Sequence, residues 1–213
     1  MSFELRSEVC RANRALLTNG LVTMHSGNVS GLDRASGKLY IKPSGVDYDS
    51  MTAEQMVEVD LLTGESSGGM KPSVDLPHHL FLYRQDPEIC AVVHTHSNFA
   101  TAFASCGLGI PAVLTAIADE FGGEIPCTPY ADNEGEHIGE AILAHRTSAP
   151  AILLANHGVF AWGSSVSDAL KAAVMVEDVA KTVWLAKQIA TPQPLPEGEI
   201  AKWHDRYQNR YGQ

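Results

Sequence analysis

The chain has 213 residues, of which 45% are hydrophobic and 19% charged, a composition typical of a globular protein that buries a core without disulfide bonds. Fifteen basic residues against 25 acidic ones give a formal charge of −10, which argues against sequence-independent binding of nucleic acid or of an anionic membrane. The four cysteines show no paired spacing, and neither a signal peptide nor a membrane-length apolar run is present. We therefore expect a cytoplasmic protein with reduced thiols.

The first part of the chain predicts one amphipathic helix, followed by short strands and polar loops. Apolar residues at helical spacing, ended by Asn19-Gly20, predict the helix. Alternation and turn residues predict the strands. The expected elements are a helix over 3–18, a hairpin with its turn at 33–38 and a strand at 39–41, a short helix over 52–56, a strand over 57–62 and a helix over 76–84.

The second part alternates apolar strands with helices. The expected elements are a strand over 91–97, a helix over 98–106, an extended edge segment over 125–130, a helix over 135–145, a strand over 151–155, a long helix over 166–190, a proline-rich linker over 191–198 and a tail helix over 199–210. The stretch 113–123 predicts no element. Without an internal repeat or a change in composition, we expect one domain spanning 1–213.

Two apolar strands end in histidines. His94 and His96 close the strand that begins at Ala91, and their side chains point the same way because residues i and i+2 share a face. His157 follows the strand over 151–155. Neutral imidazoles on rigid strands are common ligands of zinc. With Asp75 they would form a His₃Asp set for Zn²⁺ or another divalent first-row ion. The alternatives are ordinary polar strand ends and, for Asp75, a helix cap.

Three small polar loops contain donors for an anion. Lys42, Ser44 and Gly45 follow one strand, and the other two loops contain Gly27-Asn28 and Lys71-Pro72-Ser73. Glycine lets backbone N–H groups approach an anion closely. Together the loops can surround a phosphate, although each one alone also fits a plain turn.

Five motifs, in order along nearly the whole chain, resemble the class II aldolase/adducin family: GNVS at 27–30, IKPSG at 41–45, KPSVD at 71–75, HTHS at 94–97 and NHGVFAWG at 156–163. The resemblance implies an α/β fold, a single three-layer domain with a central, mainly antiparallel β-sheet flanked by α-helices. It also implies a homotetramer with active sites between subunits, acting on a sugar phosphate.

The resemblance also assigns site residues. It implies Zn²⁺ on His94, His96 and His157, with Asp75 as the fourth ligand. With Lys42 from the loop argument, the substrate-binding positions are Gly27, Asn28, Lys42, Ser44, Gly45, Ser73 and Val74. The implied acid/base pair is Asp119 and Tyr211, the tyrosine donated by the adjacent subunit, with His204 and Thr115 as helpers. Read without the family, Asp119 is a solvated loop carboxylate and Tyr211 a terminal residue.

Asp119 and the C-terminal Tyr-Gly-Gln resemble the L-ribulose-5-phosphate 4-epimerases more than the L-fuculose-phosphate aldolases. An epimerase would convert L-ribulose 5-phosphate to D-xylulose 5-phosphate by retro-aldol cleavage of C3–C4 and re-addition. The alternatives are an aldolase of the L-fuculose-1-phosphate type and a non-catalytic adducin-like binding module. Two departures stand out: Val74 replaces an expected serine, and the tail between His204 and Tyr211 is short.

Overall fold

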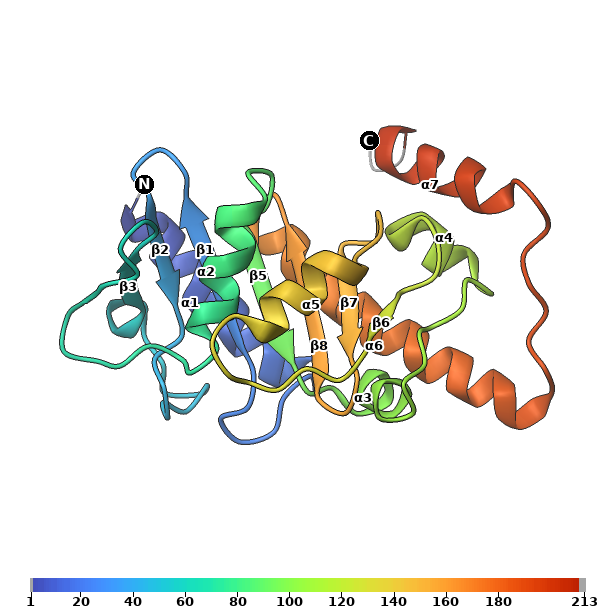
Figure 1. The fold of residues 1–213 in the computed structure, drawn as a ribbon, viewed down its shortest axis with the longest axis horizontal. Helices are drawn as coiled ribbons and strands as arrows, with labels where there is room; N and C mark the ends of the chain where they lie inside the picture. The colour runs from blue at the N-terminus through green and yellow to red at the C-terminus, as the bar shows by residue number, and fades with distance from the viewer. Residues whose placement is uncertain (1, 211–213) are drawn as a thin grey trace.

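The computed structural model describes residues 2–210, and these build one mixed eight-stranded sheet with helices on both faces (Figure 1). The strands are β1 (Asn28–Asp33), β2 (Lys38–Ile41), β3 (Val57–Asp60), β4 (Ser66–Ser67), β5 (Ala91–Thr95), β6 (Cys127–Thr128), β7 (Ala151–Leu154) and β8 (Gly158–Gly163). Their order in the sheet is β4-β3-β2-β1-β5-β8-β7-β6. Only the β6–β7 pair is parallel among the described strands, so the expected mainly antiparallel sheet is confirmed.

The helices are α1 (Ser2–Thr18), α2 (Leu76–Gln85), α3 (Asn98–Ser105), α4 (Thr115–Phe121), α5 (His137–His145), α6 (Val166–Ile189) and α7 (Glu199–Arg210), with a 3₁₀ turn at Ala53–Gln55. They form two layers. Helices α2 and α5 pack on one face of the sheet, in front in Figure 1, and α1, α3, α4 and α6 pack on the other. Val92 and Val93 face opposite cores because successive strand residues alternate. The three-layer expectation is confirmed.

Three elements were not expected from the sequence: helix α4, strand β8 and the two-residue strand β4, which pairs with β3. Helix α4 occupies the stretch where no element was predicted, and it is short, lacks a side-chain cap, and ends at Gly122 in the left-handed conformation. Strand β8 lies within the NHGVFAWG motif and is buried on both faces, so it has no polar alternation to reveal it. The predicted short helix at 52–56 is a single 3₁₀ turn.

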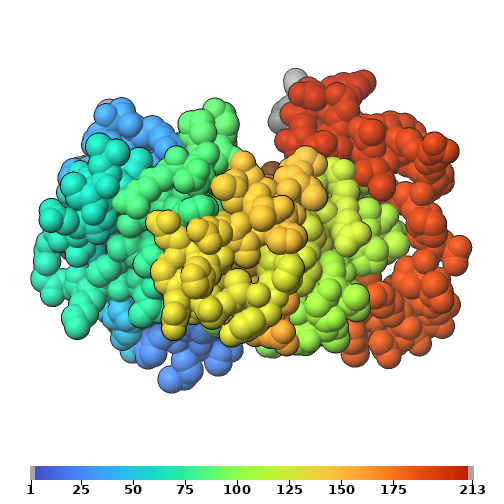
Figure 2. Space-filling view, in the orientation of Figure 1, coloured from blue at the N-terminus to red at the C-terminus, as the bar shows by residue number. Residues whose placement is uncertain are grey.

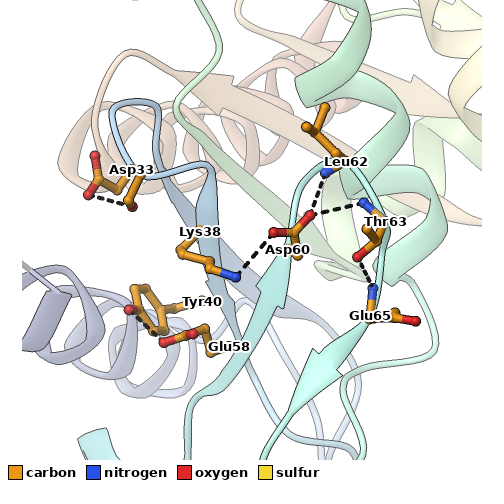
Figure 3. A network of polar contacts seen from close by, with 9 residues as sticks. Asp33, Lys38, Tyr40, Glu58, Asp60, Leu62, Thr63 and Glu65 are labelled. Atoms are coloured by element: carbon orange, nitrogen blue, oxygen red, sulfur yellow. Dashed lines mark hydrogen bonds and ion pairs between the residues drawn. The ribbon is translucent and has the colours of Figure 1, made fainter.

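Polar side chains connect strands β2 and β3 and the turns beside them (Figure 3). Lys38 Nζ lies 3.1 Å from Asp60 Oδ2, joining neighbouring residues across β2 and β3. Asp60 Oδ1 also accepts the backbone N–H groups of Leu62 and Thr63, each at 3.0 Å. This carboxylate closes the turn after β3, which explains why the strand ends there.

The C-terminal segment forms an arm. An exposed linker, 191–198, leaves the end of α6, and α7 packs on α4 (Figures 1 and 2). The ring of His204 lies against Gly122, and Lys171 Nζ of α6 lies 5.3 Å from the centre of the Tyr207 ring. Over residues 2–210, no helix combines the length and the apolar character that crossing a bilayer requires.

Candidate metal centre

Three imidazoles converge at one end of the sheet, where strand β5 ends and where the chain turns from β7 into β8. His94 is in β5, His96 lies one residue beyond its end, and His157 lies in the turn between β7 and β8. The ring centroids are 4.7 Å apart for His94–His96, 5.0 Å for His94–His157 and 5.1 Å for His96–His157. One nitrogen from each ring lies within 4.8 Å of the others. This spacing suits ligands of a single ion.

The turn that contains His157 depends on the two residues that flank it, Asn156 and Gly158. Asn156 has φ of 59°, a left-handed conformation that asparagine tolerates better than most residues. Gly158 follows, and a Cβ atom there would lie 2.6 Å from Cδ2 of His96. Only glycine therefore lets β8 start this close to the histidines.

The three imidazole rings are in the neutral form that can bind a metal ion. Nδ1–H of His94 donates to the carbonyl oxygen of Val159 at 2.9 Å, which leaves Nε2 as a lone-pair donor. Burial lowers the pKa of His94 to about 3 and also lowers the pKa values of His96 and His157. Nε2 of His96 is buried and has no hydrogen-bond partner among the described residues. A set of neutral imidazoles with an unsatisfied buried nitrogen fits a divalent cation.

Asp75 lies directly before α2, but its side chain does not cap that helix. Instead, Oδ2 accepts hydrogen bonds from Nδ2 of Asn28 at 2.6 Å and from Oγ of Ser73 at 3.2 Å. Burial acts to raise the pKa of Asp75. The neighbouring histidines, His94 first, together with these two hydrogen bonds, hold the pKa below its ordinary value. An ionised carboxylate therefore lies beside the three imidazoles, although it is outside the 4.8 Å cluster that they form.

The structure brings together the three polar loops that the sequence singled out. The backbone N–H of Ser44 donates to Lys71 O, and the N–H of Ser73 donates to Lys42 O, each at 2.9 Å. Asn28 Nδ2 also donates to Ser73 Oγ at 3.1 Å. The loops therefore lie side by side next to Asp75.

Two of the predicted substrate-binding residues, Gly45 and Val74, are exposed. Val74 is 73% exposed, so its side chain faces solvent. Gly45 has φ of 70°, and a Cβ placed there would meet no other atom within 4 Å. Both positions therefore border open space.

Lys42 is almost entirely buried, at 2% exposed. Its Nζ lies 4.8 Å from the centre of the Tyr48 ring and donates to the carbonyl of Pro43 at 3.4 Å. Burial lowers the pKa of Lys42, and Asp47 and Asp75 oppose that shift. Tyr48 OH in turn lies 2.7 Å from the carbonyl oxygens of Ser26 and Gly27. The lysine is therefore a buried cation beneath the loops.

Asp119 and His204 lie elsewhere in the chain. Strand β8 runs from Gly158, beside the histidines, to Gly163, a span of roughly 16 Å. Gly163 and Trp162 line a cavity of about 410 Å³ together with Glu120 and His204. Nδ1–H of His204 donates to the carbonyl of Asp119 at 3.0 Å. Within one protomer, these two predicted residues therefore pair with each other at the far end of β8.

The remaining predicted helpers are separate from the cluster. Thr115 opens α4 and is exposed. Tyr211 lies outside the described residues. The predicted site thus divides into a metal and loop group at one end of the sheet and an α4–α7 group at the other.

Two buried residues near the histidine cluster, Ser30 and His79, were not predicted from the sequence to be functional. His79 Nδ1 lies 2.7 Å from Ser30 Oγ, and both residues are fully buried. The sequence offered only that His79 lies four residues after Asp75, and hence on the same face of a helix.

Comparisons with known proteins show which family and which solved structures the chain resembles. The family model described as "Class II Aldolase and Adducin N-terminal domain" matches residues 7–184. An L-fuculose 1-phosphate aldolase superposes with a TM-score of 0.86 at 28% identity, covering 96% of both chains. YgbL from Escherichia coli, described provisionally as an aldolase/epimerase/decarboxylase, gives 0.83 at 29% identity, over 95% of this chain and 99% of its own. L-Fuculose-1-phosphate aldolase from Thermus thermophilus shares the fold, with 0.72 at 24% identity, over 89% and 98%.

Proposed function

Because the chain belongs to the class II aldolase/adducin family, we propose that it is a metal-dependent enzyme that breaks and re-forms a carbon–carbon bond in a ketose phosphate. The reaction we assign is conversion of L-ribulose 5-phosphate to D-xylulose 5-phosphate. The observation that carries the proposal is the convergence of His94, His96 and His157 at the ends of β5 and β7. A divalent ion held there, with Zn²⁺ our expectation and Asp75 its further ligand, would supply Lewis-acid stabilisation of negative charge on a substrate oxygen.

The loops beside the histidines provide the means to bind a phosphate. The Ser44 hydroxyl and the Gly45 backbone N–H are the proposed donors, because the N–H groups of Ser44 and Ser73 already bond to Lys71 O and Lys42 O. The Ser73 hydroxyl donates to Asp75 and would turn from it to bind a phosphate, and Asn28 ties these loops to Asp75. Lys42 contributes positive charge from below rather than a direct contact, since its Nζ is buried against Tyr48. In this arrangement the phosphate anchors the substrate while its ketone end reaches the histidines.

Epimerisation at C4 needs a proton removed on one face of the sugar and returned on the other. We assign these tasks to Asp119 and Tyr211, each worth roughly 10²–10⁴ in rate. Asp119 lies at the far end of β8 from the histidines of its own chain. The proposal therefore requires a neighbouring subunit to supply it, which is consistent with a homotetramer whose active sites lie between subunits. His204 would then act by holding the Asp119 backbone.

The test is an assay of the purified protein loaded with zinc and supplied with L-ribulose 5-phosphate. We expect D-xylulose 5-phosphate, followed through a coupled reaction specific for that product. Protein stripped of metal by a chelator should lose the activity and regain it on reloading. No conversion at full zinc occupancy would overturn the assignment.

A second candidate is an aldolase of the same family, because the L-fuculose 1-phosphate aldolase superposes over 96% of both chains. Release of dihydroxyacetone phosphate from L-fuculose 1-phosphate, without epimerisation of L-ribulose 5-phosphate, would favour it. A protein that takes up no metal from a zinc-containing buffer would instead favour a non-catalytic binding module.

A further inference from the structure

A stripe of polar residues on α2 faces a matching pair on β1. Asp75, His79 and Tyr83 are spaced by four residues along the helix, a rise of about 6 Å per step. Asn28 and Ser30 are two residues apart on β1, about 6.6 Å. Because the two spacings are nearly equal, Asn28 meets Asp75 and Ser30 meets His79.

The second contact is part of a buried chain of hydrogen bonds. Ser30 Oγ lies 2.7 Å from His79 Nδ1 and 2.6 Å from Tyr83 OH. All three residues are completely excluded from solvent, in a layer otherwise built from apolar side chains, mostly leucine, isoleucine and valine. Nε2 of His79 has no hydrogen-bond partner among the described residues. Burying these groups is costly, and an apolar set would fill the same space without that penalty.

We propose that Ser30, His79 and Tyr83 form a buried register lock that holds α2 at one position along β1 and so keeps Asp75 beside the three imidazoles. The ligand role of Asp75 rests on the proposed function; the lock itself rests on the contacts above. His79 is a positioning residue, since it acts on the metal centre through Asp75.

Directional polar contacts can fix a register that apolar packing leaves loose. If α2 slipped by one turn, Asp75 would move about 5.4 Å along the helix axis, which would break its 2.6 Å bond to Asn28. Apolar side chains such as Leu76 and Leu80 can repack after such a slip, whereas the Ser30–His79 and Ser30–Tyr83 bonds cannot both re-form.

A second contact runs from the lock to the histidine cluster. The Phe160 ring stacks on His94 with centroids 4.5 Å apart, and it meets the His79 ring edge-on at 5.6 Å. The same aromatic side chain of β8 therefore touches a candidate ligand and a lock residue. The Phe160 ring therefore connects the lock to the metal centre by direct packing.

The test is zinc affinity of the full-length apo protein, measured by competition with a chromophoric chelator. His79→Leu should weaken zinc binding by about 10–100-fold, the range typical when a residue supporting a metal ligand is lost. His79→Asn, which can still offer a polar group to Ser30, should recover part of the loss. Tyr83→Phe, which removes one hydroxyl, should show a smaller loss.

Tyr40→Phe is the matched control. Tyr40 lies in β2 and is buried like Tyr83 of α2, but its hydroxyl donates to Glu58 at 3.0 Å, away from the histidines. Its zinc affinity should equal that of the wild type. Thermal unfolding of each apo protein shows whether it is folded. If His79→Leu does not fold, the zinc affinities of Tyr83→Phe and Tyr40→Phe are compared instead, and a loss in Tyr83→Phe alone supports the lock.

A double-mutant cycle separates a lock from a general structural role. In an Asp75→Asn background, His79→Leu should cause little further loss of zinc affinity, because both changes act on the same ligand. Equal losses in both backgrounds, or His79→Leu and Tyr83→Phe binding zinc as the wild type does, would overturn the lock. A wild type that binds no zinc, or an Asp75→Asn variant that binds it normally, would instead count against the proposed metal centre.

Discussion

Gly27 approaches His94 so closely that a Cβ atom added to the glycine would lie 2.7 Å from the His94 carbonyl oxygen. It would also lie 2.7 Å from Cγ1 of Val22, and the φ of Gly27, 84°, is unfavourable for residues with side chains. The start of β1 therefore rests directly on the strand that carries two of the imidazoles.

We expect Gly27→Ala to lower the free energy of unfolding by about 2–4 kcal/mol, because strain and overpacking add, and to weaken zinc binding by displacing His94. Gly37→Ala is the control. Gly37 has φ of 67°, but a Cβ there meets nothing within 4 Å, so only the backbone strain of about 1 kcal/mol is expected. Urea unfolding and zinc titration of both variants check the prediction. Equal effects of the two substitutions would contradict it.

The buried histidines predict how the stability of the apo protein depends on pH. Burial lowers the pKa values of His79 and His94 to about 3, whereas in the unfolded chain both titrate near 6.5. Between these values the His79 and His94 imidazoles together bind about two more protons in the unfolded state than in the folded state. Stability is therefore complete above pH 6.5 and is lost as the pH falls below it.

Urea unfolding of the chelator-treated protein at intervals from pH 7 to pH 4.5 should show this decline. The His79→Leu variant, where it folds, should show a slope smaller by about one proton. A wild-type stability that does not change over this range would contradict the buried neutral state of the histidines.

The contact between His204 and Asp119 predicts a local effect on the C-terminal arm. His204→Ala removes a hydrogen bond worth about 1 kcal/mol and the packing of the ring on Gly122. We expect faster proteolysis at the exposed linker 191–198 and within α7, with little change in the main unfolding transition. His145→Ala, at an exposed histidine bonded only within its own helix, is the control and should leave the proteolysis rate unchanged.

The proposed acid/base pair predicts two variants that keep the metal but lose activity. Asp119→Asn should slow epimerisation by about 10²–10⁴-fold and spare slow bond cleavage, because it leaves the histidines untouched. Deleting residues 211–213 removes Tyr211 and should likewise keep the fold and the zinc content. Zinc analysis and circular dichroism provide the controls. Full epimerase activity in the truncated protein would remove Tyr211 from the mechanism.

Val74 occupies the position in the KPSVD loop where a serine was expected. Its side chain is exposed beside Ser73, so Val74→Ser should add a phosphate donor without affecting the core. One additional hydrogen bond of about 1 kcal/mol corresponds to a roughly fivefold lower KM, with kcat unchanged. Val74→Ala separates the hydroxyl from the loss of bulk. If serine and alanine have the same effect, Val74 does not face the phosphate.

Local pattern was sufficient for much of the fold. The 3.6-residue spacing and the Asn19-Gly20 stop predict α1. A long run rich in alanine and valine, followed by the proline-rich linker, predicts α6. The period of two in the strand predicted over 91–97 places His94 and His96 on one side. These features depend on residues close together in sequence, where the geometry of one helix or strand fixes which side chains share a face.

Helix α4 and strand β8 could not be found in this way. Helix α4 has only seven residues and no capping side chain, so its stability comes from packing against α6 and α7. Strand β8 lies inside the sheet, between β5 and β7, with buried residues on both faces, and its pattern does not alternate.

The sequence by itself determined which three histidines come together, because the strand ends and the motifs carry His94, His96 and His157. Only the tertiary structure decided that Asp75 binds Asn28 rather than capping α2, and that Asp119 lies at the opposite end of β8. The physical reason is that these relations join segments 47 to 85 residues apart. Their distances are set by how the layers pack on the sheet, and no local periodicity encodes that packing.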